Sequence, residues 1–333
     1  MLNKFHFPIL MLVLIALSLS ACNSFGGPTA PPATDLTQLP ISQEKRDPMT
    51  ALTGTPAVSA ASGSIKLTIA NNSDWNICYA YLTPPTQDTW GKDRLSGQPE
   101  VAPGASQTMP FDAGTFDLRA ENCDYMALDE RYGVDLSGDY TWQVNGPKEL
   151  YFEDFSGSQA AWKITPGSEG QVSVVDQSLH LTGSQKNNLA MVTLAGQGTD
   201  STIVVESTSV QKPAVGTAAF GVMCRVQANG DGYLFLARSD NQFSIEKVKG
   251  QLRTALVDWT ASQDVTLEAG VNVIEAECKG SQLRLRINGL TVEKTEDAEF
   301  TGGNYGLGVV GFANGPATYQ FDNLSIVLPD QFK

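Results

Sequence analysis

The segment LRLRINGLTVEK, residues 283–294, decides the fold class of this chain. Over 283–287 apolar residues alternate with arginine, which is the two-residue period of a β-strand with one buried face. Asn288-Gly289 follows, and a type I′ turn favours this dipeptide because both of its central residues have positive φ. A second run, LTVEK, comes directly after the turn. The segment therefore predicts a β-hairpin that turns one face toward a core.

The same alternation recurs on both sides of this hairpin, in short runs bounded by Gly, Asn, Asp or Pro. No segment after Gly63 keeps a helical period. We therefore predict an all-β chain with two β-sandwich domains, a small one over 63–147 and a larger one over 150–329. Besides the hairpin strands, the predicted strands are Ile65–Ile69, Cys78–Leu82, Phe116–Ala120, Tyr140–Val144, Phe220–Val226, Tyr233–Leu236, Phe243–Val248, Ile274–Cys278, Tyr305–Phe312 and Tyr319–Val327.

The first residues predict export. Phe7 to Ala21 is an apolar run with two serines, too short to span a bilayer and ending in small residues, so we interpret residues 1–21 as a signal peptide. Leu19-Ser20-Ala21-Cys22 resembles the bacterial lipobox, which implies that Cys22 is diacylated and becomes the mature N-terminus. An ordinary signal peptide or an uncleaved anchor is the alternative. Residues 22–62 are rich in Pro, Thr, Ala and Gly, and predict a disordered tether.

Composition excludes some functions. The 333 residues hold 22 Lys and Arg against 36 Asp and Glu, a formal charge of −14. Nucleic-acid binding draws its affinity from basic side chains on phosphates, so this balance argues against it. The same acidity leaves the acyl chains on Cys22 as the predicted contact with a cell membrane or outer membrane. The protein would face the periplasm or the outside.

The other four cysteines fall two in each predicted domain. An even pair per domain in an exported protein predicts one disulfide each, Cys78–Cys123 and Cys224–Cys278. The alternation places both cysteines of the second domain on inward faces. Buried free cysteines are the alternative interpretation.

The stretch from about Tyr151 to Val327 resembles the concanavalin A-like jelly-roll superfamily of lectin and laminin-G type. More narrowly, it is similar to bacterial lipoprotein modules related to the 3-keto-disaccharide hydrolase-like domain of unknown function. The residues that carry this resemblance are Glu153–Ser156 with Trp162, Val174–Leu179, Phe220–Val222, Gly232–Phe235, Leu256–Thr260, Leu285–Gly289, Tyr305–Gly308 and Phe321–Leu324.

The resemblance implies a fold more than an activity, because this superfamily includes lectins, glycosidases and protein-binding modules. We expect non-catalytic binding of an extracellular glycan or cell-wall polysaccharide, with another surface ligand as the next choice. One alternative is a glycoside hydrolase-type enzyme of the 3-keto-disaccharide kind. Another is a structural spacer or subunit of an envelope complex. The sequence names no protein partner.

No residues are predicted to be catalytic. A jelly-roll glycosidase needs two convergent carboxylates, and Glu275 and Glu277 are predicted to lie on a solvated strand face instead. The segment Glu296–Glu299 is interpreted as a solvent-facing acidic turn. His180 is the only histidine after the signal peptide, without a partner motif for a triad or for zinc.

A structural calcium ion is the one cofactor that we consider. In lectin-type jelly rolls the first and last strands lie side by side, and calcium often binds there through oxygen ligands. Asp154 on the opening strand and Asp322 on the closing strand match that position. The alternative is that both carboxylates accept hydrogen bonds from turn backbone.

Sugar binding would use an aromatic side chain with polar groups beside it. The candidates are Trp259 beside Asp258, Tyr233, and Trp90 in the polar loop 86–93. Packing in a core is the alternative for each, and Trp90 is the best candidate for an exposed ring. Three other tryptophans are assigned to the core: Trp75, Trp142 and Trp162.

Overall fold

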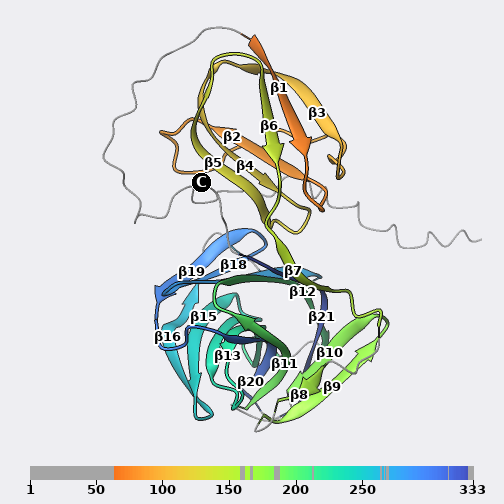
Figure 1. Cartoon of the computed structure of the whole chain (residues 1–333). Coiled ribbons are helices and arrows are strands. Elements are labelled where there is room, and N and C mark those ends of the chain that lie inside the picture. The colour runs from red at the N-terminus through yellow and green to blue at the C-terminus, as the bar shows by residue number, and fades with distance from the viewer. Residues whose placement is uncertain are drawn as a thin grey trace, which may run out of the picture. The chain divides into compact units, whose positions relative to one another are not determined.

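The computed structural model describes residues 64–157, 162–165, 168–183, 188–211, 214–262, 265, 267, 270–313 and 315–328. All of them belong to one compact unit of the chain. The predicted signal peptide, Cys22 and the predicted tether lie outside the described residues. Among the described residues there is no helix, and the strands run from β1 to β21 (Figure 1).

The small domain consists of two three-stranded sheets (Figure 1). In the first sheet β1 lies between β3, which is antiparallel to it, and β6, which is parallel. In β1 every second residue from Ile65 onward is buried, as the alternation predicts. The strands of the first sheet are β1 (Ser64–Asn71), β3 (Ser106–Asp112) and β6 (Tyr140–Val144), and those of the second are β2 (Tyr79–Thr83), β4 (Gly114–Glu121) and β5 (Ala127–Leu136).

The large domain is a β-sandwich of an eight-stranded and a seven-stranded sheet. The eight-stranded sheet contains β7 (Glu149–Glu153), β9 (Gly170–Val175), β10 (Ser178–Gly183), β12 (Ser201–Gln211), β17 (Asn272–Lys279), β18 (Gln282–Ile287), β19 (Leu290–Glu296) and β21 (Ala317–Val327). The seven-stranded sheet contains β8 (Lys163–Ile164), β11 (Leu189–Gly198), β13 (Ala218–Val226), β14 (Gly232–Arg238), β15 (Gln242–Lys249), β16 (Leu252–Ala261) and β20 (Gly303–Gly311). The predicted all-β class is confirmed.

The main core lies between these two sheets. Alternate residues of β13 and β14, such as Phe220, Val222 and Phe235, meet alternate residues of β17 and β18, such as Ile274 and Leu285. Burying such side chains provides most of the favourable free energy of folding. Two of the tryptophans assigned to the core, Trp142 in the small domain and Trp162 in the large one, are buried, whereas Trp75 is half-buried.

The hairpin that predicted the fold has the expected turn. Ile287 of β18 pairs with Leu290 of β19, and the two residues between them, Asn288 and Gly289, have φ of 49° and 79°. Positive φ at both positions is what a type I′ turn requires. Asn288 also accepts a hydrogen bond on Oδ1 from the backbone N–H of Val273, 2.8 Å away.

Both predicted disulfides are present. Cys78 bonds to Cys123 in the small domain, and Cys224 of β13 bonds to Cys278 of β17 across the core of the large one. Disulfides persist in oxidising compartments, which fits a protein of the periplasm or the cell exterior.

One structural finding concerns membrane-spanning helices. Within the described ranges, the chain has no helix of the length and hydrophobicity that a bilayer crossing needs.

The two sheets of the large domain also bury residues on the faces that point away from the core. On the eight-stranded sheet Glu275 and Glu277 are only 6% and 7% exposed, so the prediction of a solvated strand face is wrong. The alternation correctly predicted that both side chains point away from the main core. It did not predict that other parts of the chain cover that face. On the seven-stranded sheet a second apolar cluster forms outside the core. Both outer faces therefore carry buried side chains that lie outside the main core.

Candidate ligand-binding face

The outer face of the seven-stranded sheet has an apolar floor. Met223, Leu234 and Leu236 are fully buried there, on the side opposite the core, together with Val310. Gly308 lies close beneath them, since a Cβ atom at this position would lie 3.0 Å from Leu189 Cδ1 and 3.3 Å from Leu234 Cδ1. The floor is therefore a packed surface that carries other groups above it.

An aromatic pair stands at one end of this floor. The rings of Trp259 and Phe312 have centroids 5.5 Å apart and meet at 89°, the edge-to-face arrangement that aromatic quadrupoles favour. The Arg238 guanidinium lies 4.6 Å from the centre of the Trp259 ring, within the range of a cation–π contact. Both contacts hold the half-buried indole in one orientation.

Arg238 has a carboxylate partner of its own. Its Nε and Nη2 donate to the two oxygens of Asp240 at 2.7 and 2.8 Å, a bidentate pair. These hydrogen bonds lower the pKa of Asp240. At neutral pH the pair adds no net charge to the face.

A second ion pair lies beside the aromatic pair. Arg253 Nη1 donates to Glu246 Oε2 at 2.9 Å, and the same guanidinium lies 5.7 Å from the Phe312 ring centre. Glu246 is only 5% exposed. Burial raises its pKa, while the nearby Arg253 acts in the opposite direction. Glu246 is thus a buried carboxylate whose charge depends on one arginine.

The face opens into a hollow of about 170 Å³. Arg253 forms part of its wall, so the hollow continues directly from the ion pair. Its lining mixes apolar floor residues with amide, hydroxyl and charged groups from four loops and strand ends: Ser168, Glu169, Asn188, Leu189, Met191, Asn229, Gly230, Val248, Gln251 and Arg253. Ligand pockets commonly combine an apolar floor with a few polar groups in this way.

The structure places the four predicted ligand-binding residues in different surroundings. Trp259 lies on the face, and Asp258 beside it is exposed. Tyr233 is a core residue with 0% exposure, and its hydroxyl donates to Asp297 Oδ1 at 2.5 Å. Trp90 is 1% exposed, so the expectation that its loop leaves the ring open to solvent is wrong. It packs against Tyr132 and under the guanidinium of Arg119.

Sequence reasoning missed the other groups of the face, namely Arg238, Glu246, Arg253 and Phe312. A signal for Glu246 was present, because Phe243 and Ile245 alternate with Ser244 and Glu246 and so fix which of them turn outward. The two arginines and Phe312 carry no such signal, because they lie near strand ends where local sequence does not fix the neighbouring strand.

The acidic segment after β19 is only partly solvent-facing. Glu296 and Glu299 are exposed as predicted. Asp297 is half-buried, where it accepts hydrogen bonds from Tyr233 and from Lys247 Nζ, the latter at 2.7 Å. These partners lower the pKa of Asp297 even though burial opposes this. The segment fixes a turn over the edge of the core.

At both predicted calcium positions the carboxylate accepts a backbone hydrogen bond, as in the alternative arrangement. Asp322 Oδ1 accepts one from the N–H of Asn323 at 2.8 Å. Asp154 Oδ1 accepts hydrogen bonds from the backbone N–H and the hydroxyl of Ser156, at 3.0 and 2.7 Å. Burial, and to a smaller extent the negative charge of Asp154, raises the pKa of Asp322. Calcium binding stays a prediction.

Two further groups carry chemistry of their own. His180 is half-buried on β10, and burial lowers its pKa. In the part of the chain that the structure describes, one set of His, Cys, Asp or Glu ligand atoms lies close enough to hold a metal, namely Cys78, Glu100 and Cys123. Both cysteines of that set are in a disulfide and are not thiolate ligands.

Neither a protein-family model nor a curated protein matches the chain. Solved structures resemble it in fold. A carbohydrate-binding module, CBM66, from Bacillus subtilis shares 18% identity at a TM-score of 0.41, over 50% of this chain and 95% of that one. A Bacillus subtilis protein of unknown function with a galectin-like fold shares 13% at 0.42, over 55% and 98%. A Bacillus licheniformis β-glucanase shares 8% at 0.41, over 53% and 97%.

Proposed function

We propose that this protein is a non-catalytic exported lipoprotein, anchored through Cys22, that binds an uncharged glycan on the outer face of its seven-stranded sheet. The observation that carries the proposal is the aromatic pair of Trp259 and Phe312, standing above an apolar floor beside the Arg253–Glu246 ion pair. The hollow of about 170 Å³ continues from that ion pair.

The chemistry of a sugar matches these groups. Apolar C–H faces of a sugar ring pack on an aromatic side chain, and its hydroxyls both donate and accept hydrogen bonds. Arg253 supplies donors and Glu246 supplies acceptors within one ion pair. Asn188 and Asn229 on the wall of the hollow add amides that offer both. Because Arg238 and Phe312 fix the indole of Trp259, little conformational freedom would be lost on binding.

The charges of the face favour a neutral ligand. Arg238 and Arg253 each have a carboxylate partner, so neither is a spare cation for a uronate, sulfate or phosphate group. The chain as a whole carries a formal charge of −14, which repels polyanions.

The arrangement of carboxylates supports binding over hydrolysis. A retaining or inverting glycosidase uses two carboxyl groups that flank one glycosidic bond. On this face Glu246 and Asp240 are each held by an arginine, and Glu169 accepts a hydrogen bond from Asn188 at 2.8 Å. Each of the three carboxylates therefore has a structural partner.

A glycan-array screen of the full chain, with and without calcium, tests the proposal. We expect hits among uncharged glycans that Trp259→Ala abolishes. Tyr132→Ala is the matched control, because Tyr132 is an aromatic residue with 48% exposure on the small domain. Its loss should leave the hits unchanged.

Three results would overturn the proposal. A blank array would favour a structural role in an envelope complex. Hits confined to anionic glycans would contradict the neutral ligand. Release of reducing sugar from a bound glycan, lost in Glu246→Gln, would show that the face is an active site.

A further inference from the structure

The outer face of the eight-stranded sheet holds buried charges instead of aromatic rings. Arg286 of β18 donates from Nη1 to both oxygens of Glu275 on β17, each at 3.1 Å, and from Nη2 to the carbonyl of Gly289 at 2.7 Å. The side chains of Arg286 and Glu275 are 4% and 7% exposed. Charges buried to this degree need partners on every side.

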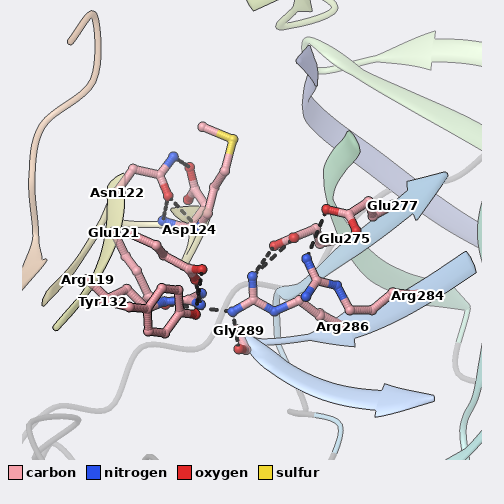
Figure 2. A network of polar contacts seen from close by, with 12 residues as sticks. Arg119, Glu121, Asn122, Asp124, Tyr132, Glu275, Glu277, Arg284, Arg286 and Gly289 are labelled. Carbon is pink, nitrogen blue, oxygen red and sulfur yellow. Dashed lines mark hydrogen bonds and ion pairs between the residues drawn. The ribbon is translucent and has the colours of Figure 1, made fainter. Parts of the chain in front are cut away.

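One of those partners belongs to the small domain. Glu121, at the end of β4, places Oε1 3.7 Å from Arg286 Nη2, and its side chain has no exposed surface (Figure 2). The same oxygen accepts a hydrogen bond from Arg119 Nε at 2.5 Å, and Arg119 also pairs with Glu130 of β5. The ionic network thus runs from the small domain across to the large one (Figure 2).

Apolar side chains join the two domains beside this network. Val204 of β12, Val273 of β17 and Val327 of β21 belong to the same apolar cluster as the core of the small domain. They lie on the outer side of the eight-stranded sheet, since Ile203, Ile274 and Ile326 next to them point into the main core. The interface between the small and the large domain, called the joint below, therefore has an apolar part and an ionic part.

The ionic part selects one arrangement of the joint. It contains two arginines, Arg119 and Arg286, and three glutamates, Glu121, Glu130 and Glu275. A shift of one domain against the other would separate the buried side chains of Arg286 and Glu121. A buried ion pair adds little net stability over an apolar pair of the same volume, but an unpaired buried charge is strongly unfavourable. The network therefore rejects other placements more than it strengthens this one.

We propose that the outer face of the eight-stranded sheet is an intramolecular docking surface whose partner is the small domain of the same chain, and that the network of Arg119, Glu121, Glu275 and Arg286 locks the two domains into one rigid body. The face of the seven-stranded sheet is then the one left for a ligand. This inference does not depend on what that ligand is.

Charge reversal in the full chain tests the lock. Arg286→Glu places a third carboxylate between Glu121 and Glu275, and should open the joint. Arg284→Glu is the matched control, because Arg284 is also on β18 but pairs with Glu277 within its own sheet at 2.9 Å. Small-angle X-ray scattering measures the opening as a larger radius of gyration, and calorimetry as two separated unfolding transitions in place of one.

A variant of the small domain guards against a folding defect in the sheet. Glu121→Lys places a third cation beside Arg119 and Arg286 without changing the large domain, and should give the same larger radius and the same split transition. The proposal fails if Arg286→Glu and Glu121→Lys both scatter and melt like the wild type. It also fails if Arg284→Glu opens the chain as much as Arg286→Glu does.

Discussion

The two outer faces of the large sandwich arise from the same alternation of residues along the strands, but only one of them is covered by the small domain. On the eight-stranded sheet the outward side chains include the Glu275–Arg286 pair and three valines, and the small domain covers them. On the seven-stranded sheet the outward side chains form an apolar floor with an aromatic pair above it, and the face opens into a hollow. One face buries charged side chains against the small domain of the same chain. The other has an aromatic and polar surface that the small domain does not cover.

This difference shows how the small domain covers one outer face of the sandwich and not the other. On the covered side Arg286 pairs with Glu275 of its own sheet and with Glu121 of the small domain, and three valines pack into the core of that domain. The ion pairs of the other face, Arg238–Asp240 and Arg253–Glu246, are each complete on their own sheet. Neither pair needs a partner from the small domain.

The largest effect should come from breaking the ionic face. Glu275→Ala removes the carboxylate whose two oxygens both accept from Nη1 of the buried Arg286, and should lower the free energy of unfolding by about 3–5 kcal/mol. Glu277→Ala, on the same strand, removes the partner of Arg284, whose side chain is 25% exposed, and should cost about 1 kcal/mol. Urea denaturation of both variants measures the contrast, and equal losses would contradict it.

Truncating the apolar floor should cost almost as much. Leu234→Ala removes a fully buried side chain from the outer face of the seven-stranded sheet, and should destabilise the protein by about 2–4 kcal/mol, as in a true core. Leu252→Ala on β16 is the control, since that side chain is 74% exposed and should change stability by less than about 0.5 kcal/mol. A small loss in Leu234→Ala would mean that the floor is loosely packed.

Removing the aromatic ring should act on binding more than on folding. Trp259→Ala should weaken glycan affinity about tenfold or more, equivalent to about 1.4 kcal/mol, with a smaller change in unfolding free energy than Leu234→Ala gives. Isothermal titration with the strongest array ligand measures the affinity. Unchanged affinity would remove the aromatic pair from the binding face.

The smallest effect concerns two carboxylates near the joint. Burial raises the pKa of Asp124 in the small domain and of Glu206 on β12, and the charge of Asp124 raises that of Glu206 further. The folded state therefore binds protons more readily than the unfolded state, so both groups add stability as the pH falls from neutral through their raised pKa values. The stability gap between wild type and Asp124→Asn/Glu206→Gln should narrow over that window in urea titrations. A gap that is constant with pH would contradict this.

Local sequence predicted the parts of the molecule that depend on local chemistry. The Asn288-Gly289 turn, the strand alternation and the inward positions of Cys224 and Cys278 follow from backbone sterics and a two-residue period. The alternation also correctly predicted that the Glu275 side chain points away from the main core. It could not show that a second domain covers that face, because the partner, Glu121, lies more than a hundred residues away.

The aromatic residues show the same limit. Trp90 lies in a polar loop, and that loop predicts exposure, but Arg119 and Tyr132 from two other strands enclose the ring. Arg238 at the end of β14 and Phe312 directly after β20 complete the surroundings of Trp259 in the same way. Which of several tryptophans meets a ligand is decided by these long-range neighbours.

Hydrogen–deuterium exchange of the full chain, with and without a saturating array ligand, tests the central claim most directly. We predict slower exchange on binding in β11, β15 and β16 and in the segments 168–170 and 228–231 around the hollow, with no change in β17 and β18. Protection in β17 and β18 with none around Trp259 would place the ligand on the opposite sheet and contradict the account.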